Sequence, residues 1–100
     1  MTKVKLFPNG FSVKGHCSTN VNDEAGKLVC AAVSSAVYLV VNTITDVIGD
    51  KADITEKDGE MVLKIHSVSE HSKTVLKGFK IHILQLSEQY PDCIKVNSEV

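Results

Sequence analysis

The sequence predicts an α+β fold in which two helices pack on a mainly antiparallel sheet of about five strands, in the order ββαββαβ. Three observations predict it: short segments with alternating apolar and polar residues, two longer segments with apolar residues at helical spacing, and turn-forming residues between them. The chain has 100 residues, of which 43% are hydrophobic, and no repeat or linker divides it. We therefore expect a single domain over residues 1–100, small enough that dimerisation would help to stabilise it.

Two strands are expected at the start of the chain. Residues 2–7 alternate lysine with valine and leucine, and residues 11–14 alternate apolar with polar side chains. The Pro-Asn-Gly run at 8–10 lies between these segments and is typical of a turn, so the two strands should pair antiparallel. Gly15 then leads into a polar loop, which places His16 at the end of a strand.

The longest apolar segment, residues 26–48, is predicted to be a mostly buried helix. Its apolar residues recur at intervals of three or four, with a narrower polar side. The β-branched residues at 37–41 favour a strand, whereas the length of the segment and the following Gly49 favour a helix. A start near Gly26 or Lys27 would place Cys30 in the first turn, where unpaired N–H groups and the helix dipole favour a thiolate. A start at Asp23 would remove most of that benefit.

A hairpin is expected next, with strands over residues 51–57 and 60–66. The two segments are joined by Asp58 and Gly59, and an Asp-Gly pair between alternating segments is a strong hairpin signal. Ala52 and Ile54 should face the same side of the sheet.

The second helix is predicted to begin with a capping box and to end before a proline. Ser67 would be the N-cap and Glu70 its partner three residues later, and Pro91 would end the helix. Gly78 inside it either allows a close approach of another backbone or is simply tolerated. Residues 93–97 alternate as a last strand.

Composition excludes several classes of function. A net charge of -1 and a pI near 6.4 provide no general attraction to nucleic acid, so no direct nucleic-acid binding is expected. Three cysteines show no disulfide framework, and the first residues lack a secretory signal, which predicts a reduced, cytoplasmic protein. No membrane span is expected, because polar residues interrupt the richest apolar run, namely Ser34, Ser35, Asn42, Thr43 and Thr45.

His16 and Cys30 are the candidate catalytic pair. A thiolate is the attacking form of cysteine, and a neighbouring imidazole can accept the thiol proton and later protonate the leaving amine. The two residues are fourteen positions apart, so they cannot share a helix face. They can meet only if the loop over residues 17–27 folds back and returns the chain beside Gly15.

Three short motifs resemble the ribosomal-processing cysteine protease family. They are Gly-His at 15–16, VCAAVS at 29–34, and Tyr-Pro at 90–91 followed by an alternating strand. The resemblance spans essentially the whole chain. It implies a small dimeric cysteine endopeptidase without a cofactor, which removes the N-terminal extension of a large-subunit ribosomal protein precursor. It also implies that His16 is the base and Cys30 the nucleophile, and Ser34 matches a position that the family usually keeps as serine.

The chain departs from the family pattern at two positions. Lys27 stands where the family generally has an aspartate, three residues before the cysteine, and Cys17 stands where it has a small residue after the histidine. On a helix, Lys27 would share a face with Cys30, and a cation near a thiol favours the thiolate. Lys27 is therefore, with Ser34, a candidate supporting residue.

Other interpretations of these residues remain open. A cysteine among alanines and valines is usually a small core residue, and Ser34 could simply bond a backbone carbonyl. His16, Cys17 and Cys30 could supply three zinc ligands, although no paired ligand spacing supports a metal site, and none is expected. The remaining histidines are interpreted as surface or structural residues, and the second-helix lysines as a solvated face or a contact for acidic or ribosomal partners; they are His66, His71, His82, Lys73, Lys77 and Lys80.

The alternative function belongs to a different class. A protein with the same fold could act as a non-catalytic dimeric, ribosome-associated interaction module. Rapid alkylation of Cys30 relative to Cys17 and Cys93 at neutral pH would favour the enzyme.

Overall fold

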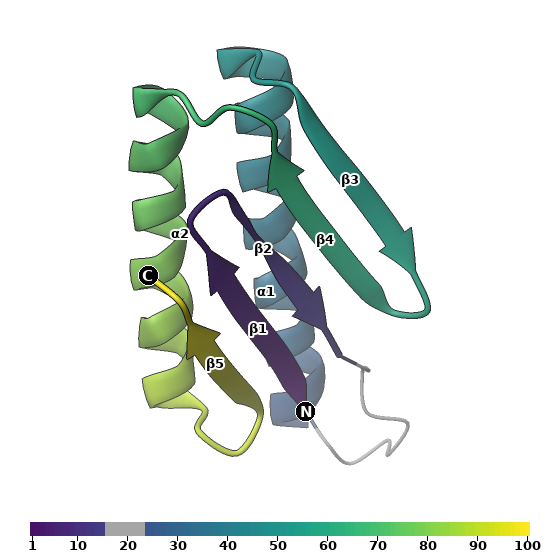
Figure 1. The fold of residues 1–100 in the computed structure, drawn as a ribbon. Coiled ribbons are helices and arrows are strands. Elements are labelled where there is room, and N and C mark those ends of the chain that lie inside the picture. The colour runs from purple at the N-terminus through teal and green to yellow at the C-terminus, as the bar shows by residue number, and fades with distance from the viewer. Residues whose placement is uncertain (16–23) are drawn as a thin grey trace.

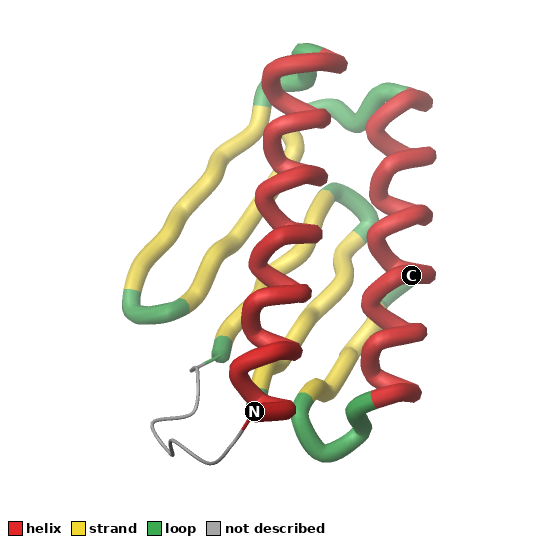
Figure 2. The backbone as a smooth tube through the Cα atoms, turned by 180° about the vertical axis from the view of Figure 1, so that it is seen from behind, coloured by secondary structure: helices red, strands yellow, loops and turns green. Residues whose placement is uncertain are grey.

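The computed structural model describes residues 1–15 and 24–100, and it shows two helices packed side by side on one face of a five-stranded sheet (Figures 1 and 2). The order of strands and helices is the predicted ββαββαβ. The elements are β1 (Thr2–Phe7), β2 (Gly10–Lys14), α1 (Glu24–Asn42), the π-helical turn η1 (Thr43–Ile48), β3 (Ala52–Lys57), β4 (Glu60–Ile65), α2 (Glu70–Gln89) and β5 (Ile94–Ser98).

The strands lie in the order β3-β4-β2-β1-β5, and only the contact between β1 and β5 is parallel. Both hairpins join neighbouring strands, while α1 carries the chain from β2 to β3 and α2 carries it from β4 to β5. In the β3–β4 turn, Asp58 and Gly59 have φ angles of 54° and 76°. These left-handed values are those of the expected two-residue turn.

The core lies between the sheet and the two helices. The buried face of α1 is made by valines at helical spacing, and the facing strands contribute leucine, isoleucine, valine and phenylalanine. Phe11 of β2 stacks on Phe79 of α2, with ring centroids 4.4 Å apart. The fully buried large side chains at the centre are Val4, Phe11, Val29, Val33, Ile44, Leu63, Ile65 and Ile83.

The first helix is longer than expected at its N-terminal end. It begins by Glu24, not at Gly26 or Lys27, so Gly26 is a helical residue and not the end of a loop. Glutamate in a first turn is stabilised by the helix dipole, which accounts for the earlier start. The C-terminal end agrees with the prediction: Gly49 adopts φ 88°, and its N–H donates to the carbonyl of Ile44.

The helix that comprises α1 and η1 contradicts the expectation that no apolar segment is long enough to span a membrane. Its 25 residues, Glu24–Ile48, are long and apolar enough to cross a membrane by length and composition. Its valine face is buried against the sheet, but only 33% of the apolar window is buried, and Leu28, Leu39 and Val47 are exposed. The expectation of a mostly buried helix is therefore wrong: one face packs on the sheet and the rest of the helix is open.

The capping box predicted for α2 is wrong, because Ser69 and not Ser67 is the N-cap. The Ser69 hydroxyl accepts a hydrogen bond from the N–H of Ser72 at 3.2 Å. It also donates to Asp50 Oδ2 at 2.8 Å, and the Ser69 N–H donates to the same oxygen at 3.1 Å. Asp50, which follows η1, therefore selects the cap through a tertiary contact, and Glu70 becomes the first helical residue.

This cap should make the fold sensitive to acid. The hydroxyl of buried Ser72, followed by the N–H and hydroxyl of Ser69, holds the pKa of Asp50 below its ordinary value of 3.8. The Ser72 hydroxyl makes no hydrogen bond among the described residues, so it acts on the carboxylate as a nearby dipole. Because the folded pKa is lowered, the ionised carboxylate stabilises the fold above the unfolded pKa, and this contribution is lost as the pH falls through the folded value.

We therefore expect Asp50→Ala to lower the melting temperature at pH 7. The difference in melting temperature between parent and variant should become progressively smaller below about pH 4. Thermal unfolding followed by circular dichroism from pH 7 to pH 3 measures the difference between parent and variant. A difference that stays constant over this range would contradict the role of the ionised carboxylate. Asp46→Ala, which removes an exposed carboxylate on η1, is the control.

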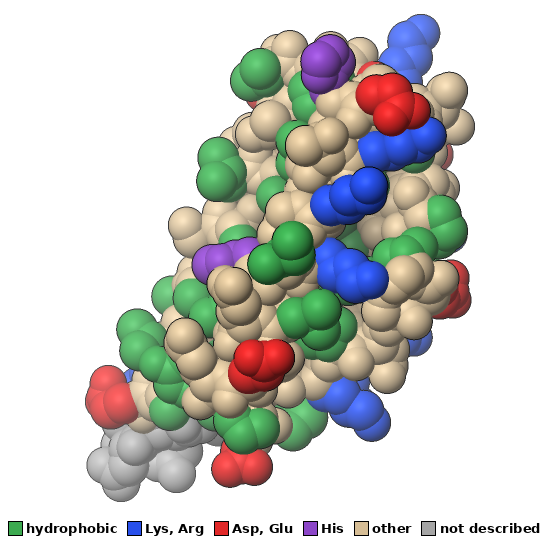
Figure 3. Space-filling view, turned by 90° about the vertical axis from the view of Figure 1, so that its left-hand side faces the viewer, with side chains coloured by type: hydrophobic (Ala, Val, Ile, Leu, Met, Phe, Trp, Pro, Cys, Tyr) green, Lys and Arg blue, Asp and Glu red, His purple; other side chains and the backbone are tan. Residues whose placement is uncertain are grey.

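The lysines of α2 share one side of the helix, as expected. Figure 3, which looks onto the side of the molecule where α2 lies, shows basic side chains in a row. Lys73 pairs with Glu70 at 3.0 Å, and the Lys80 ammonium donates to the carbonyl of Val100 at 2.5 Å. With Lys77 they border a groove of about 350 Å³ between α2 and the β1–β2 turn. His66, His71 and His82 are exposed, also as expected.

Candidate active site

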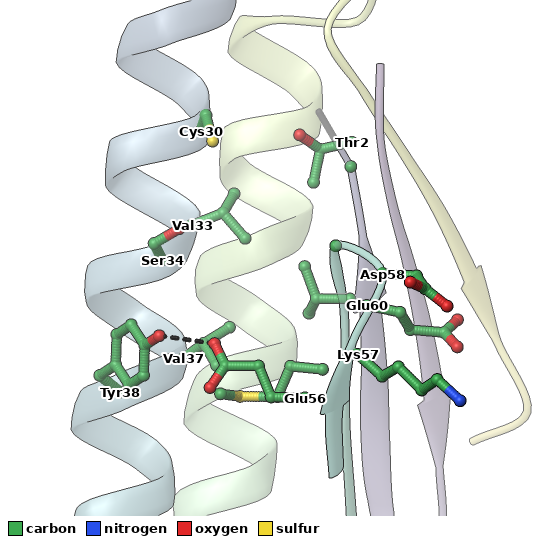
Figure 4. Close-up of a pocket in the computed structure, with 14 residues that line it drawn as sticks. Thr2, Cys30, Val33, Ser34, Val37, Tyr38, Glu56, Lys57, Asp58 and Glu60 are labelled. Carbon is green, nitrogen blue, oxygen red and sulfur yellow. Dashed lines mark hydrogen bonds between the residues drawn. The ribbon is translucent and has the colours of Figure 1, made fainter. Parts of the chain in front are cut away.

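A cleft of about 270 Å³ opens between α1 and the strand ends opposite it (Figure 4). One side is formed by a strip of α1, and the other by the start of β1, the end of β2 and the β3–β4 hairpin. The α1 residues recur at helical spacing, which brings them to one wall; they are Cys30, Val33, Ser34, Val37 and Tyr38. Of the predicted site residues, the cleft therefore brings together Cys30 and Ser34.

Cys30 is half-buried in the second turn of α1 and borders the cleft. Of the two helix starts considered, the structure agrees with the earlier one, because the helix extends back to Glu24, and Cys30 is not in its first turn. The N–H groups beside Cys30 are therefore inside the helix and are not the unpaired groups of its end.

Gly15 lies in the same cleft, at the end of β2. Its N–H donates to the carbonyl of Gly59 at 3.4 Å, and a Cβ added to it would lie 2.9 Å from both the Cα and the Oγ1 of Thr2. Only glycine fits this contact, because a Cβ at that distance overlaps backbone atoms. The residue that precedes His16 is thus held at the cleft that Cys30 borders, whereas His16 and Cys17 themselves lie outside the described residues.

The two candidate supporting residues differ in their relation to the cleft. Ser34 is one turn beyond Cys30 and is exposed at the cleft. Lys27 is exposed and is not among the residues that border the cleft.

Lys27→Ala should slow alkylation of Cys30 by iodoacetamide at neutral pH by about twofold to fivefold. Lys27 precedes Cys30 by three helical positions, and a cation on that face favours the thiolate, although exposure to solvent weakens the effect. Mass spectrometry of the labelled peptide follows the rate, with Lys73→Ala on the other helix as the control. An unchanged rate would show that the ammonium does not act on the thiol.

Sequence reasoning missed the contribution of the β3–β4 hairpin to the cleft. The Tyr38 hydroxyl of α1 donates to Glu56 Oε1 of β3 at 2.8 Å (Figure 4). The hydrogen bond to Glu56, then the negative charge of Glu56 and then burial raise the pKa of Tyr38. Alternation along the strand is the sequence signal that could have placed Glu56 at the cleft. Glu56 is two residues beyond Ile54, so the two side chains share one side of the strand.

A metal centre is not supported by the part of the chain that the structure describes. No group of three histidine, cysteine, aspartate or glutamate residues is arranged to hold an ion in residues 1–15 and 24–100. Of the three ligands considered for zinc, only Cys30 lies in these ranges. The described cleft offers the Cys30 thiol, the Ser34 hydroxyl one helical turn away, and the Glu56 carboxylate farther along, at Tyr38.

Comparisons with known proteins agree with a proteolytic site. The sequence model of the family described as cysteine protease Prp matches residues 1–95. The ribosomal processing protease Prp from Staphylococcus aureus, in complex with a covalently linked product peptide, has 17% identity and a TM-score of 0.79, with 98% of this chain and 97% of that chain covered. Its complex with a substrate peptide has 18% identity and a TM-score of 0.78, with the same 98% and 97% coverage.

A protein from Streptococcus mutans has 19% identity and a TM-score of 0.80, with 98% of this chain and 93% of that chain covered. A search of curated proteins found no match. At these identities the structures show the shared fold, while the family match over nearly the whole chain carries the chemistry.

Proposed function

The chain belongs to the cysteine protease Prp family and is a cysteine protease, and from this premise we propose that it removes the N-terminal extension of a large-subunit ribosomal protein precursor with a His16/Cys30 dyad. The observation that supports the dyad is the cleft itself. It is bordered both by Cys30 and by Gly15, the residue directly before His16. The proposed substrate class rests on the Prp enzyme of Staphylococcus aureus, which is a ribosomal processing protease.

The proposed reaction proceeds in two steps. His16 accepts the proton of the Cys30 thiol, and the thiolate attacks the scissile carbonyl carbon to form a tetrahedral intermediate. The intermediate collapses to a thioester while the imidazolium gives its proton to the leaving amine. Water then attacks the thioester with His16 as the base, which releases the new carboxylate and restores the thiol. The peptide is held extended in the cleft during both steps.

Cleavage of a tagged precursor tests this function directly. The chain is incubated with a large-subunit ribosomal protein that carries an N-terminal extension, and the products are analysed by mass spectrometry. We expect one cut, at the junction between the extension and the mature protein, and no cut in the same protein without its extension. Cleavage at many sites, or none, would overturn the proposed substrate.

We also propose that the enzyme is a homodimer in the cytoplasm and needs no nucleic-acid contact. A domain of this size has a limited core, and several large apolar side chains of α1, η1 and α2 remain exposed, namely Leu28, Leu39, Val47, Ile81 and Leu84. Light scattering at micromolar concentration should give the mass of two chains. A monomer would contradict this proposal without affecting the dyad.

A further inference from the structure

Glu56 is the charged side chain of the hairpin that points across the cleft toward α1. It pairs in register with Met61, whose side chain faces the helices and is buried. Figure 4 shows Glu56 reaching toward Tyr38, whereas Lys57, Asp58 and Glu60 extend away from the helix. The alternation of a strand explains the difference, because neighbouring residues face opposite sides of the sheet.

The Glu56 carboxylate is held in place by one of its oxygens. Tyr38 donates its hydrogen bond to Oε1 at 2.8 Å, which ties the hairpin to the helix. The raised pKa of Tyr38 is consistent with a charged acceptor at this distance. A carboxylate has acceptor sites on both oxygens, so the second oxygen is available for another donor.

The floor of the cleft beside this carboxylate is apolar. Val33 and Val37 of α1 and Met61 of β4 line it, and they are largely buried, with at most 9% of each exposed. An apolar floor that leads to a positioned carboxylate suits a side chain with an aliphatic stem and a cationic head. Lysine and arginine have this form, because they can pack their methylene groups on apolar surface and direct the charge to a carboxylate.

We propose that Glu56 is a specificity-determining residue that selects a lysine or arginine side chain of the peptide substrate. The inference rests on the proposed function, because it assigns the substrate to the cleft of Cys30. Tyr38 follows Cys30 by eight helical positions, or roughly 12 Å along the helix. An extended peptide advances about 3.3 Å per residue, so a long basic side chain on a residue two to four positions from the scissile bond reaches Glu56.

Paired peptides measure this selectivity. Each pair carries either lysine or norleucine, which has a similar aliphatic stem but no charge, at one of four positions on each side of the cut. At one of these positions the parent enzyme should cleave the lysine peptide with the higher kcat/KM. Glu56→Gln should reduce the lysine-to-norleucine ratio there by about fivefold, as expected for an exposed ion pair, and added salt should also reduce the parent ratio.

Two further variants separate recognition from a structural role. Glutamine can still accept the hydrogen bond of Tyr38, so Glu56→Gln removes the charge while keeping the link between helix and hairpin. Asp58→Asn removes a charge of the same sign from a side chain that points away, and should leave the ratio unchanged. Glu56→Lys should favour peptides with glutamate at the selected position.

Binding to the Cys30→Ala protein, followed by fluorescence anisotropy, distinguishes failure of this inference from failure of the proposed function. The Cys30→Ala protein should bind the lysine peptide more tightly than the norleucine peptide, and adding Glu56→Gln should remove this difference. That result supports the inference even where no cleavage occurs. Equal binding and equal cleavage of the two peptides by the parent, or an equal loss of both in Glu56→Gln, would overturn it. In that case Glu56 only links the hairpin to the helix.

Discussion

Replacement of Cys30 by alanine is expected to abolish peptide cleavage, with a loss of about 10⁴-fold or more, because the proposed covalent step uses its thiolate as the nucleophile. His16→Ala should cause a comparable loss, since the thiol then has no proposed base. Cys30 is only half-buried, so its truncation should leave the fold intact. Cleavage of the tagged precursor measures activity, and circular dichroism checks the fold.

The other two cysteines provide the controls. Cys17→Ala and Cys93→Ala should each retain most of the activity. Cys93 lies at the turn before β5, where its carbonyl accepts from the N–H of Thr2, and it does not border the cleft. If Cys17→Ala were the inactive variant and Cys30→Ala the active one, the assignment of the nucleophile would be wrong.

The second large effect is expected for Gly15→Ala. The added Cβ would lie 2.9 Å from the Cα of Thr2, and backbone atoms at that distance cannot move aside as a flexible side chain could. The end of β2 must therefore shift, at a cost of about 1–3 kcal/mol in the free energy of unfolding. Because His16 follows directly, kcat/KM should also fall by about 10²-fold.

Gly78→Ala is the matched control for this prediction. A Cβ added to Gly78 meets no atom within 4 Å, so the glycine is tolerated and does not mark a close backbone approach. Alanine should raise the free energy of unfolding by up to about 1 kcal/mol, because glycine is a poor helix former. Urea unfolding of both variants tests the pair. A Gly15→Ala protein with parental stability and activity would refute the proposed constraint at the strand end.

Much of the fold follows from local signals in the chain. Alternation predicts the strands, the Asp58-Gly59 pair predicts a turn that requires left-handed φ angles, and Gly49 predicts where the first helical segment ends. Each of these signals reports backbone preferences over a few neighbouring residues. The prediction of a helix through the β-branched residues 37–41 was also right, because burial of one valine face outweighs their preference for strands.

The sequence by itself determined the order of elements, and its family motif supplied the proposed nucleophile, Cys30. Only the tertiary structure decided that β2 pairs with β4 and β1 with β5, that Asp50 selects Ser69 as the N-cap, and that the β3–β4 hairpin brings Glu56 to Tyr38 beside the cleft. The physical reason is distance along the chain. The two side-chain contacts join residues 18 and 19 positions apart, and the strand pairs join residues still farther apart. Their geometry is set when the sheet and both helices bury one common core.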